Sequence, residues 1–163
     1  MAEIFAESYL GKLRHKIGND LVQLPGTRAI LENAEGKILL QLRGECRLWG
    51  LPAGSPEIDD DICGTIKREI FEETGLSVDD LSVFGYASDP LFEKHTFPNG
   101  DRIHNFSLMF FSRSWSGELI VDGEESLDLR FFDPIELPEM LANHKRSVHA
   151  YLKYKESKSF QFI

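Results

Sequence analysis

The chain has 163 residues, of which 42% are hydrophobic and 28% are charged. These are the proportions of an ordinary globular protein, and a chain of this length buries enough surface to fold without disulfides or a structural metal. We therefore expect a single domain spanning residues 1–163. The formal net charge of −9 argues against long nucleic acid as a partner, because duplex binding depends on basic groups that neutralise phosphates.

Cysteine content and apolar patterning indicate the compartment. Cys46 and Cys63 are the two cysteines, and they do not form a CxxC pair. The first residues lack the charged and then apolar order of a signal peptide, and no apolar stretch approaches the length of a membrane span. We expect a cytoplasmic protein with no membrane partner.

The first half of the chain predicts a helix, two strands, a loop and a second helix. Apolar residues at mostly helical spacing predict a leading helix or arm within residues 1–18. Residues 28–31 and 37–43 are β-like runs on either side of a turn-rich segment, which predicts a hairpin. The sequence Trp-Gly-Leu-Pro-Ala-Gly at 49–54 favours a loop whose backbone comes close to a ligand. A helix then follows, capped by one of three consecutive aspartates at 59–61 and ended by Gly75.

The second half predicts mainly strands and then closing helices. Asn99-Gly100 is a strong hairpin turn signal, here in the sequence Pro98-Asn99-Gly100-Asp101. No repeat or linker divides the chain. Residues rich in β-branched and aromatic side chains predict strands at 81–88, 102–113, 117–121 and 129–132, and closing helical segments are expected at 134–141 and 148–155.

The polarity of the central helix is unusual for a helix that serves only packing. Its apolar stripe comprises Ile62, Ile66 and Ile70. Glu69 and Glu73 lie on or beside this stripe, and Glu72 lies at its edge. Carboxylates crowded beside a buried seam are costly unless their pKa values rise or a cation lies among them, and Mg²⁺ or Mn²⁺ takes such oxygen ligands. The alternative is a solvated acidic edge on which Arg68 pairs with Glu72.

The spacing around this helix carries a family resemblance. Gly54 is followed after five residues by Asp60 and, after seven more, by Arg68-Glu69-Ile70-Phe71-Glu72-Glu73-Thr74-Gly75-Leu76. Residues 54–76 resemble the Nudix box, in which a Glu stands at the position of Asp60. Ala53 and Asp59 also replace residues that are commonly glycine in the family.

The resemblance implies an α/β Nudix fold, with a mixed β-sheet sandwiched between α-helices. It also implies Mg²⁺-dependent, or alternatively Mn²⁺-dependent, hydrolysis of a nucleoside diphosphate linked to another group, by attack of water on phosphorus. Carried over by position, the metal ligands would be Glu69, Glu72, Glu73, the carbonyl of Ala53 or Gly54 and, more weakly, Asp60. Arg68 would orient the carboxylates rather than contact substrate.

Two further roles are open. Glu69 is our first choice of general base, while Glu124 and Glu125 are loop candidates whose alternative is a solvated turn. Arg43 ends the second predicted strand next to the metal loop, where it would hold a phosphate; its alternative is a surface arginine at a strand end.

The sequence does not distinguish between several classes of substrate. A nucleotide sugar, ADP-ribose, a dinucleotide and a nucleoside triphosphate all fit the resemblance. A catalytically weak nucleotide-binding module is the alternative function, supported by Asp60, Ala53 and Asp59. A prenyl diphosphate isomerase is disfavoured because neither cysteine has a matching context. A homodimer is a further possibility, through the leading arm or an exposed strand.

Overall fold

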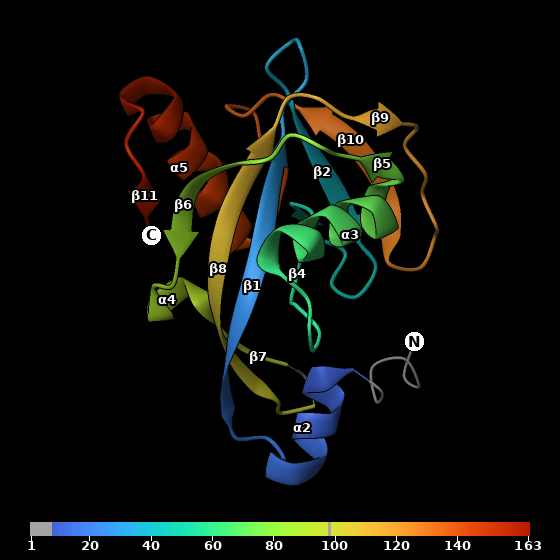
Figure 1. Ribbon diagram of the computed structural model, residues 1–163, viewed down its shortest axis with the longest axis vertical. Coiled ribbons are helices and arrows are strands. Elements are labelled where there is room, and N and C mark those ends of the chain that lie inside the picture. Colours follow the sequence, from blue (N-terminus) through green and yellow to red (C-terminus); the bar gives the residue numbers. More distant parts are fainter. Residues whose placement is uncertain (1–7, 98) are drawn as a thin grey trace.

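The computed structural model describes residues 8–97 and 99–163 as an α/β protein (Figure 1). The helices are α2 (Tyr9–Ile17), α3 (Ile62–Thr74), α4 (Pro90–Glu93) and α5 (Ala142–Ser157). The strands are β1 (Leu21–Leu31), β2 (Ile38–Arg43), β3 (Trp49–Gly50), β4 (Ala53–Gly54), β5 (Leu76–Ser77), β6 (Ser82–Ala87), β7 (Lys94–Thr96), β8 (Arg102–Ser112), β9 (Ser116–Gly117), β10 (Ser126–Phe132) and β11 (Gln161–Phe162). No helix among these residues is long and apolar enough to cross a membrane.

A mixed sheet forms the centre of the molecule. Its strand order is β11-β6-β8-β1-β4, and β7 adds to β8. The two longest strands, β1 and β8, run parallel, with Leu21 opposite Arg102 and Leu31 opposite Ser112. The neighbours β4 and β6 are antiparallel to them. A second sheet has the order β10-β2-β3.

Helices cover both faces of this strand assembly. In β1, Ile30 packs in the cluster that contains Val148 and Tyr151 of α5, whereas its neighbours Ala29 and Leu31 pack in the cluster of α3. Successive side chains of a strand point to opposite faces, so a strand that is buried on both faces reads as a continuous apolar run. The predicted fold class, a mixed sheet between helices, is confirmed.

The predicted central helix, which carries Ile62, Ile66 and Ile70, is confirmed as α3 together with its two caps. The Asp61 carboxylate accepts hydrogen bonds from the backbone N–H groups of Cys63 and Gly64, at 2.9 and 2.8 Å. Gly75 ends α3 in the left-handed conformation, with φ of 78°. Ile66 and Ile70 are fully buried, and each contributes about 1.5–3 kcal/mol. These contacts fix the rotation of α3 and therefore the positions of its glutamates.

The expected hairpin of residues 28–31 and 37–43 is wrong in its pairing. The turn exists, because Asn33 and Lys37 are hydrogen-bonded, but Glu32 and Ile38 form only an isolated bridge between the two strands. β1 continues into the large sheet and β2 into the smaller one. Each strand buries both of its faces, so the strands separate after the turn and pair with others.

Two other predicted elements are also wrong. Residues 117–121 are not a strand beyond Gly117, because Ile120 instead donates a backbone hydrogen bond to the carbonyl of Thr74 at the end of α3. Residues 134–141 are not helical, and α5 begins only at Ala142. Pro138 interrupts helical hydrogen bonding there. The Asn99-Gly100 turn lies between the paired strands β7 and β8 as predicted. Pro98 and residues 1–7 of the expected leading helix or arm lie outside the described residues, and the described part of that segment forms α2 from Tyr9.

Candidate active site

Glu69 lies against the backbone of the loop that precedes α3. A Cβ atom placed on Gly54 would lie 2.1 Å from Glu69 Cδ, a distance that no real Cβ tolerates. The carbonyl of Gly54 accepts a hydrogen bond from Thr27 Oγ1 at 3.2 Å, which ties the loop to β1. Glycine is therefore required at position 54 because it makes room for a carboxylate.

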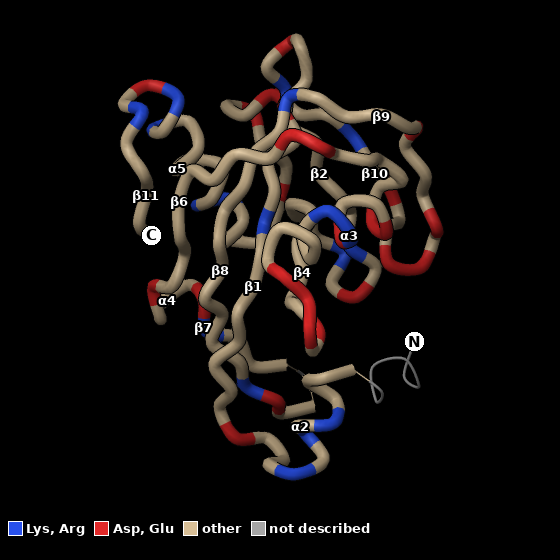
Figure 2. Tube along the Cα trace, in the orientation of Figure 1, with Lys and Arg blue, Asp and Glu red and all other residues tan. Residues whose placement is uncertain are grey.

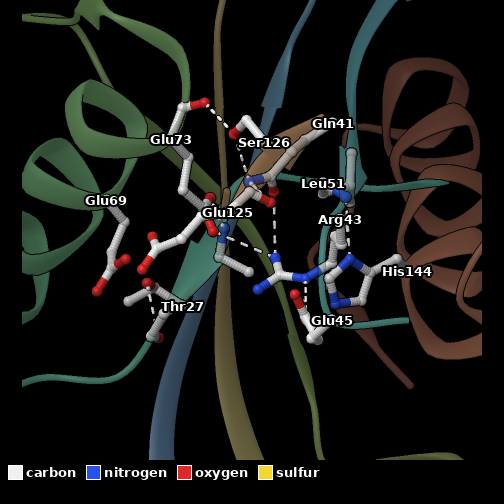
Figure 3. A network of polar contacts seen from close by, with 12 residues as sticks. Thr27, Gln41, Arg43, Glu45, Leu51, Glu69, Glu73, Glu125, Ser126 and His144 are labelled. Atoms are coloured by element: carbon white, nitrogen blue, oxygen red, sulfur yellow. Dashed lines mark hydrogen bonds and ion pairs between the residues drawn. The ribbon is translucent and has the colours of Figure 1, made fainter. Parts of the chain in front are cut away.

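Glu73, one turn further along α3, is buried at 4% exposure beneath the same loop. Its Oε2 accepts from the backbone N–H of Ala53 at 3.0 Å, and its Oε1 accepts from Arg43 Nη1 at 3.2 Å (Figure 3). Burial raises the pKa of Glu73 to about 8, since the opposing attraction of Arg43 and the Ala53 N–H does not offset desolvation. The site thus holds a carboxylate whose negative charge is incompletely compensated.

Arg68 pairs with Glu69 and with two further carboxylates beside α3. Its Nη1 lies 3.0 Å from Glu69 Oε1 and 2.9 Å from Glu72 Oε2, and its Nη2 lies 3.4 Å from Asp60 Oδ2. Asp60 also accepts from the backbone N–H of Glu57 at 3.1 Å. Glu72 lies at the edge of the helix face, as expected; its side chain is 52% exposed and pairs with Arg68, as in the alternative of a solvated acidic edge.

Counting charges around α3 shows an excess of carboxylates. Arg43 pairs with Glu45 and Glu73, while Arg68 pairs with the three acidic side chains just described. Five carboxylates therefore share two guanidinium groups. Burial raises the pKa of Glu69, and repulsion from Glu72 adds to this effect against the attraction of Arg68. Figure 2 shows further acidic residues along the segment that leads into α3 and on the loop before β10.

The loop before β10 lies beside this cluster. A Cβ placed on Gly44 would lie 1.9 Å from the carbonyl oxygen of Glu124, and the Gly44 N–H donates to the carbonyl of Glu125 at 2.9 Å. Both glutamate side chains are exposed. Figure 3 shows the Glu125 side chain directed toward the side of α3 that carries Glu69. The Glu125 side chain therefore points toward the α3 carboxylates.

Sequence reasoning missed the residues that support Arg43 and the end of α3. Gln41 Oε1 accepts from Arg43 Nη1 at 3.2 Å, and Gln41 Nε2 donates to Ser126 Oγ at 2.7 Å. Ser126 Oγ in turn donates to the backbone carbonyl of Glu73 at 2.7 Å. His144, on α5, accepts at Nδ1 from the backbone N–H of Leu51 at 2.9 Å. Apart from the contact between Gln41 and Arg43 on the same strand, these contacts join segments far apart in sequence, so no local pattern predicts them.

The donor set suits a hard divalent cation. Within residues 8–97 and 99–163, no three acidic, histidine or cysteine side chains already converge as a metal cluster. The available donors are carboxylate oxygens at Glu69 and Glu73 and the carbonyl of Gly54, the oxygen ligands that Mg²⁺ and Mn²⁺ take. The excess negative charge supplies the electrostatic reason for a cation to bind.

Comparison with known protein families identifies the family to which this fold and the motif at residues 54–76 belong. A family model described as NUDIX domain matches residues 22–152. The chain belongs to the NUDIX family. The resemblance carried by residues 54–76 is confirmed, and the chain is a Nudix hydrolase by family.

Two curated relatives and one solved structure illustrate the Nudix match. The chain is 30% identical over 127 residues to a Bacillus subtilis (strain 168) protein named "Putative 8-oxo-dGTP diphosphatase", which covers 77% of this chain and 78% of the relative. It is 31% identical over 124 residues to an ADP-ribose pyrophosphatase of Methanocaldococcus jannaschii, and the match covers 74% of this chain and 69% of the relative. The crystal structure of a MutT NUDIX hydrolase from Burkholderia pseudomallei superposes with a TM-score of 0.66 at 23% identity, covering 78% of this chain and 97% of the other.

Proposed function

We propose that this Nudix chain is a pyrophosphohydrolase that cleaves the diphosphate of a small nucleotide with the help of Mg²⁺, or alternatively Mn²⁺. The observation that carries the proposal is the pair Glu69 and Glu73, held one turn apart against the loop at Ala53 and Gly54. A diphosphate is itself anionic, so an acidic site accepts it only when cations bridge protein and substrate. We place the domain at residues 1–163 and the protein in the cytoplasm.

The proposed metal ligands are the carboxylates of the box and one loop carbonyl. The loop supplies the carbonyl of Gly54, and Glu69 and Glu73 lie against that loop. Glu72 and Asp60 pair with Arg68 and would contribute through water. A bound Mg²⁺ would neutralise charge on the diphosphate and lower the pKa of the attacking water. Arg68 holds Glu69, Glu72 and Asp60 in place by charge-assisted hydrogen bonds.

Proton transfer is assigned to Glu69 first. Water attacks phosphorus, a phosphorus–oxygen bond of the anhydride breaks, and Glu69 takes the proton of the attacking water. The raised pKa of Glu69, caused first by burial, makes it a stronger base than an exposed carboxylate. A base that is also a metal ligand is weakened, which keeps Glu125 as the second candidate and Glu124 as the third.

Arg43 is proposed to bind a substrate phosphate. Its Nε donates to Glu45 at 2.6 Å and its Nη1 to Gln41 and Glu73. Among the described residues, none accepts a hydrogen bond from Nη2, so this nitrogen is available to a phosphate oxygen. We propose a small-molecule partner, no long nucleic acid and no membrane, and we leave a homodimer open.

The substrate class is narrowed by the relatives. One is named for ADP-ribose and another for 8-oxo-dGTP, so both compounds head the list of substrates to test. Nucleotide sugars and dinucleotides follow. We measure phosphate release after phosphatase coupling, with Mg²⁺ and with Mn²⁺, for the wild type, Glu69→Gln and the matched control Glu156→Gln, an exposed glutamate on α5.

The expected result is metal-dependent hydrolysis of at least one compound, about a thousandfold slower in Glu69→Gln and unchanged in Glu156→Gln. Metal-independent turnover, or equal rates in the two variants, would refute the assigned roles.

A nucleotide-binding module without turnover is the second candidate. The observation that favours it is Asp60, whose carboxylate is engaged by Glu57 and Arg68 and is one methylene shorter than the Glu usual in the box. Restoring the longer side chain with Asp60→Glu is the discriminating change. A tenfold rise in turnover, equal to about 1.4 kcal/mol of barrier, would mean that the shorter side chain limits an active enzyme. Tight nucleotide binding with no turnover in either protein would favour the binding module.

A further inference from the structure

His144 is a buried histidine that the proposed chemistry does not use. It lies in the first turn of α5 and is 6% exposed. Its Nδ1 accepts a hydrogen bond from the backbone N–H of Leu51 at 2.9 Å. An imidazole that accepts at Nδ1 while neutral carries its proton on Nε2. The loop between β3 and β4 therefore fixes the tautomer and leaves Nε2–H as a donor.

The surroundings of His144 keep the ring neutral. Burial lowers its pKa well below the ordinary value, and the positive charges of Arg28 and Arg43 lower it further. Arg28 is already paired with Glu93, so it is not a free partner for the ring. The imidazole is consequently a neutral donor of fixed orientation at physiological pH.

The Nε2–H donor of His144 has no acceptor among residues 8–97 and 99–163. The hydrogen bond to Leu51 engages the other ring nitrogen. Nε2 also keeps some contact with solvent. Among the described residues, Arg14 Nε is the one fully buried side-chain nitrogen or oxygen without a hydrogen-bond partner, so Nε2, which has no partner, is not fully buried. A rigid, nearly buried donor that solvent still reaches is positioned to meet an acceptor on a bound molecule.

His144 and Arg43 flank one glycine. A Cβ placed on Gly50 would lie 3.1 Å from His144 Nδ1 and 3.2 Å from Arg43 Cδ. Figure 3 shows the second ring nitrogen on the side of Arg43 and Glu45. The Nε2–H of His144 and the free Nη2 of Arg43 thus form two donors at the same end of the site.

We propose that His144 is a substrate-binding residue that donates a hydrogen bond from Nε2 to a non-bridging oxygen of the substrate diphosphate, beside Arg43. This inference rests on the proposed function. A diphosphate oxygen is the acceptor that suits this place, since Arg43 offers its Nη2 to a phosphate under the proposed function and the N-terminus of α5 adds positive potential. No acidic residue lies in the first turn of α5; Leu141 at the N-cap makes no side-chain hydrogen bond, and the neutral Asn143 side chain accepts from the His144 N–H at 3.1 Å.

Two substitutions separate the hydrogen bond to Leu51 from the donor to substrate. His144→Asn places an amide oxygen near Nδ1, so it keeps the acceptor for Leu51 and removes the distal donor. His144→Gln places an amide nitrogen near Nε2, so it keeps the donor and loses the acceptor. We measure Kd by calorimetry with Mg²⁺ for methylenediphosphonate, which has no nucleoside, and for α,β-methylene-ADP, and we measure Tm for each variant.

We expect His144→Asn to keep a Tm near that of the wild type and to bind both probes about fivefold more weakly, the loss of one hydrogen bond. His144→Gln should lower Tm and bind within about twofold of the wild type. Wild-type affinity of the Asn variant for both probes would overturn the inference. Weakening only for α,β-methylene-ADP would overturn the diphosphate assignment in favour of a nucleoside contact.

A third variant keeps the inference testable if the Asn variant does not fold. His144→Met removes both hydrogen bonds while filling the space, so it should bind both probes about fivefold more weakly than His144→Gln. Equal affinities of the Met and Gln variants would overturn the inference. A wild-type protein that binds neither probe in Mg²⁺ would instead refute the proposed function, and the inference would fall with it.

Discussion

Two regions of this protein bury carboxylates and compensate their charge differently. Glu32, just beyond the end of β1, accepts hydrogen bonds from Arg113 Nε at 2.6 Å, from the Tyr151 hydroxyl at 2.7 Å and from the Lys155 ammonium. Burial raises its pKa, but these three donors outweigh burial and the pKa is lowered overall. At Glu73, burial dominates and the pKa rises to about 8.

The difference shows where the fold stabilises itself and where it retains a capacity to bind. Glu32 has two cationic partners for one carboxylate, and the buried pair of Arg28 and Glu93 is balanced one to one. Around α3, by contrast, five carboxylates share two arginines. The chain supplies counterions where an acid is structural, so the uncompensated charge at α3 is a property of the site that a bound cation would remove.

The largest expected effect comes from closing the space that Glu69 uses. Gly54→Ala places a methyl group where Glu69 Cδ now lies, so the carboxylate must move away from the loop. We expect kcat/KM to fall by about a hundredfold, equal to about 2.7 kcal/mol. Gly18→Ala, at a glycine outside the proposed site whose Cβ would meet nothing within 4 Å, is the control for substitution itself. Activity retained in Gly54→Ala would contradict the placement of Glu69.

The next effect concerns the compensated region. Glu32→Gln removes the charge that pairs with Arg113 and Lys155, and we expect the free energy of unfolding to fall by about 2 kcal/mol because both cations are partly solvated. Because the pKa of Glu32 is lowered in the folded state, this stabilisation is fully present above pH 4.5, the ordinary pKa of a glutamate. It is lost as the pH falls through the lower pKa of the folded protein. Urea unfolding at pH 7 and pH 4 checks this expectation. A variant as stable as the wild type at pH 7 would contradict it.

Glu73 should give the opposite pH dependence in the metal-free protein. Its pKa is raised from 4.5 to about 8, so the folded state binds a proton more tightly than the unfolded state. Stability should therefore fall as the pH rises through this window, and Glu73→Gln should show a flatter profile. Thermal unfolding in EDTA across the window measures both slopes. Parallel profiles for the two proteins would show that Glu73 is not the group responsible.

The smallest expected effect lies in the loop before α3. Asp59 has a φ of 71°, in the left-handed region where glycine is favoured. Asp59→Gly should relieve this strain and raise the free energy of unfolding by about 0.5 kcal/mol. Asp59→Ala, which keeps a Cβ, should not. Stabilisation by both variants would attribute the effect to the removed charge instead of the backbone.

Much of the site was predictable from the sequence because its residues lie within one local motif. The spacing from Gly54 to Leu76 fixed the loop, the caps of α3 and the relative positions of Glu69 and Glu73. The departure at Asp59 from a frequent glycine coincides with a left-handed backbone in the structure. The exposed pair of Arg68 and Glu72 is the solvated edge that the i, i+4 spacing offered as an alternative, whereas the contact of Arg68 with Asp60, eight residues away, was not predictable because it depends on the path of the loop.

The rest of the fold depends on contacts that no local pattern encodes. The strands predicted at 28–31 and 37–43 overlap β1 and β2, but β1 begins seven residues earlier, at Leu21. Besides their short neighbours β4 and β3, their partners are β8 and β10, more than 70 residues later in the chain. His144 gave no sequence signal because its partner is the backbone N–H of Leu51, and a backbone donor leaves no mark in the sequence. Long-range pairing of this kind is set by the packing of the whole domain.

The most direct test of the charge deficit at α3 is a Mn²⁺ titration followed by the loss of the free-ion EPR signal. It compares the wild type with Glu69→Gln and Glu32→Gln in the absence of nucleotide. Saturable binding that is weakened about tenfold in Glu69→Gln and unchanged in Glu32→Gln is the result we predict. Equal affinities in all three proteins, or no saturable binding by the wild type, would contradict the assignment of α3 as the cation-binding element.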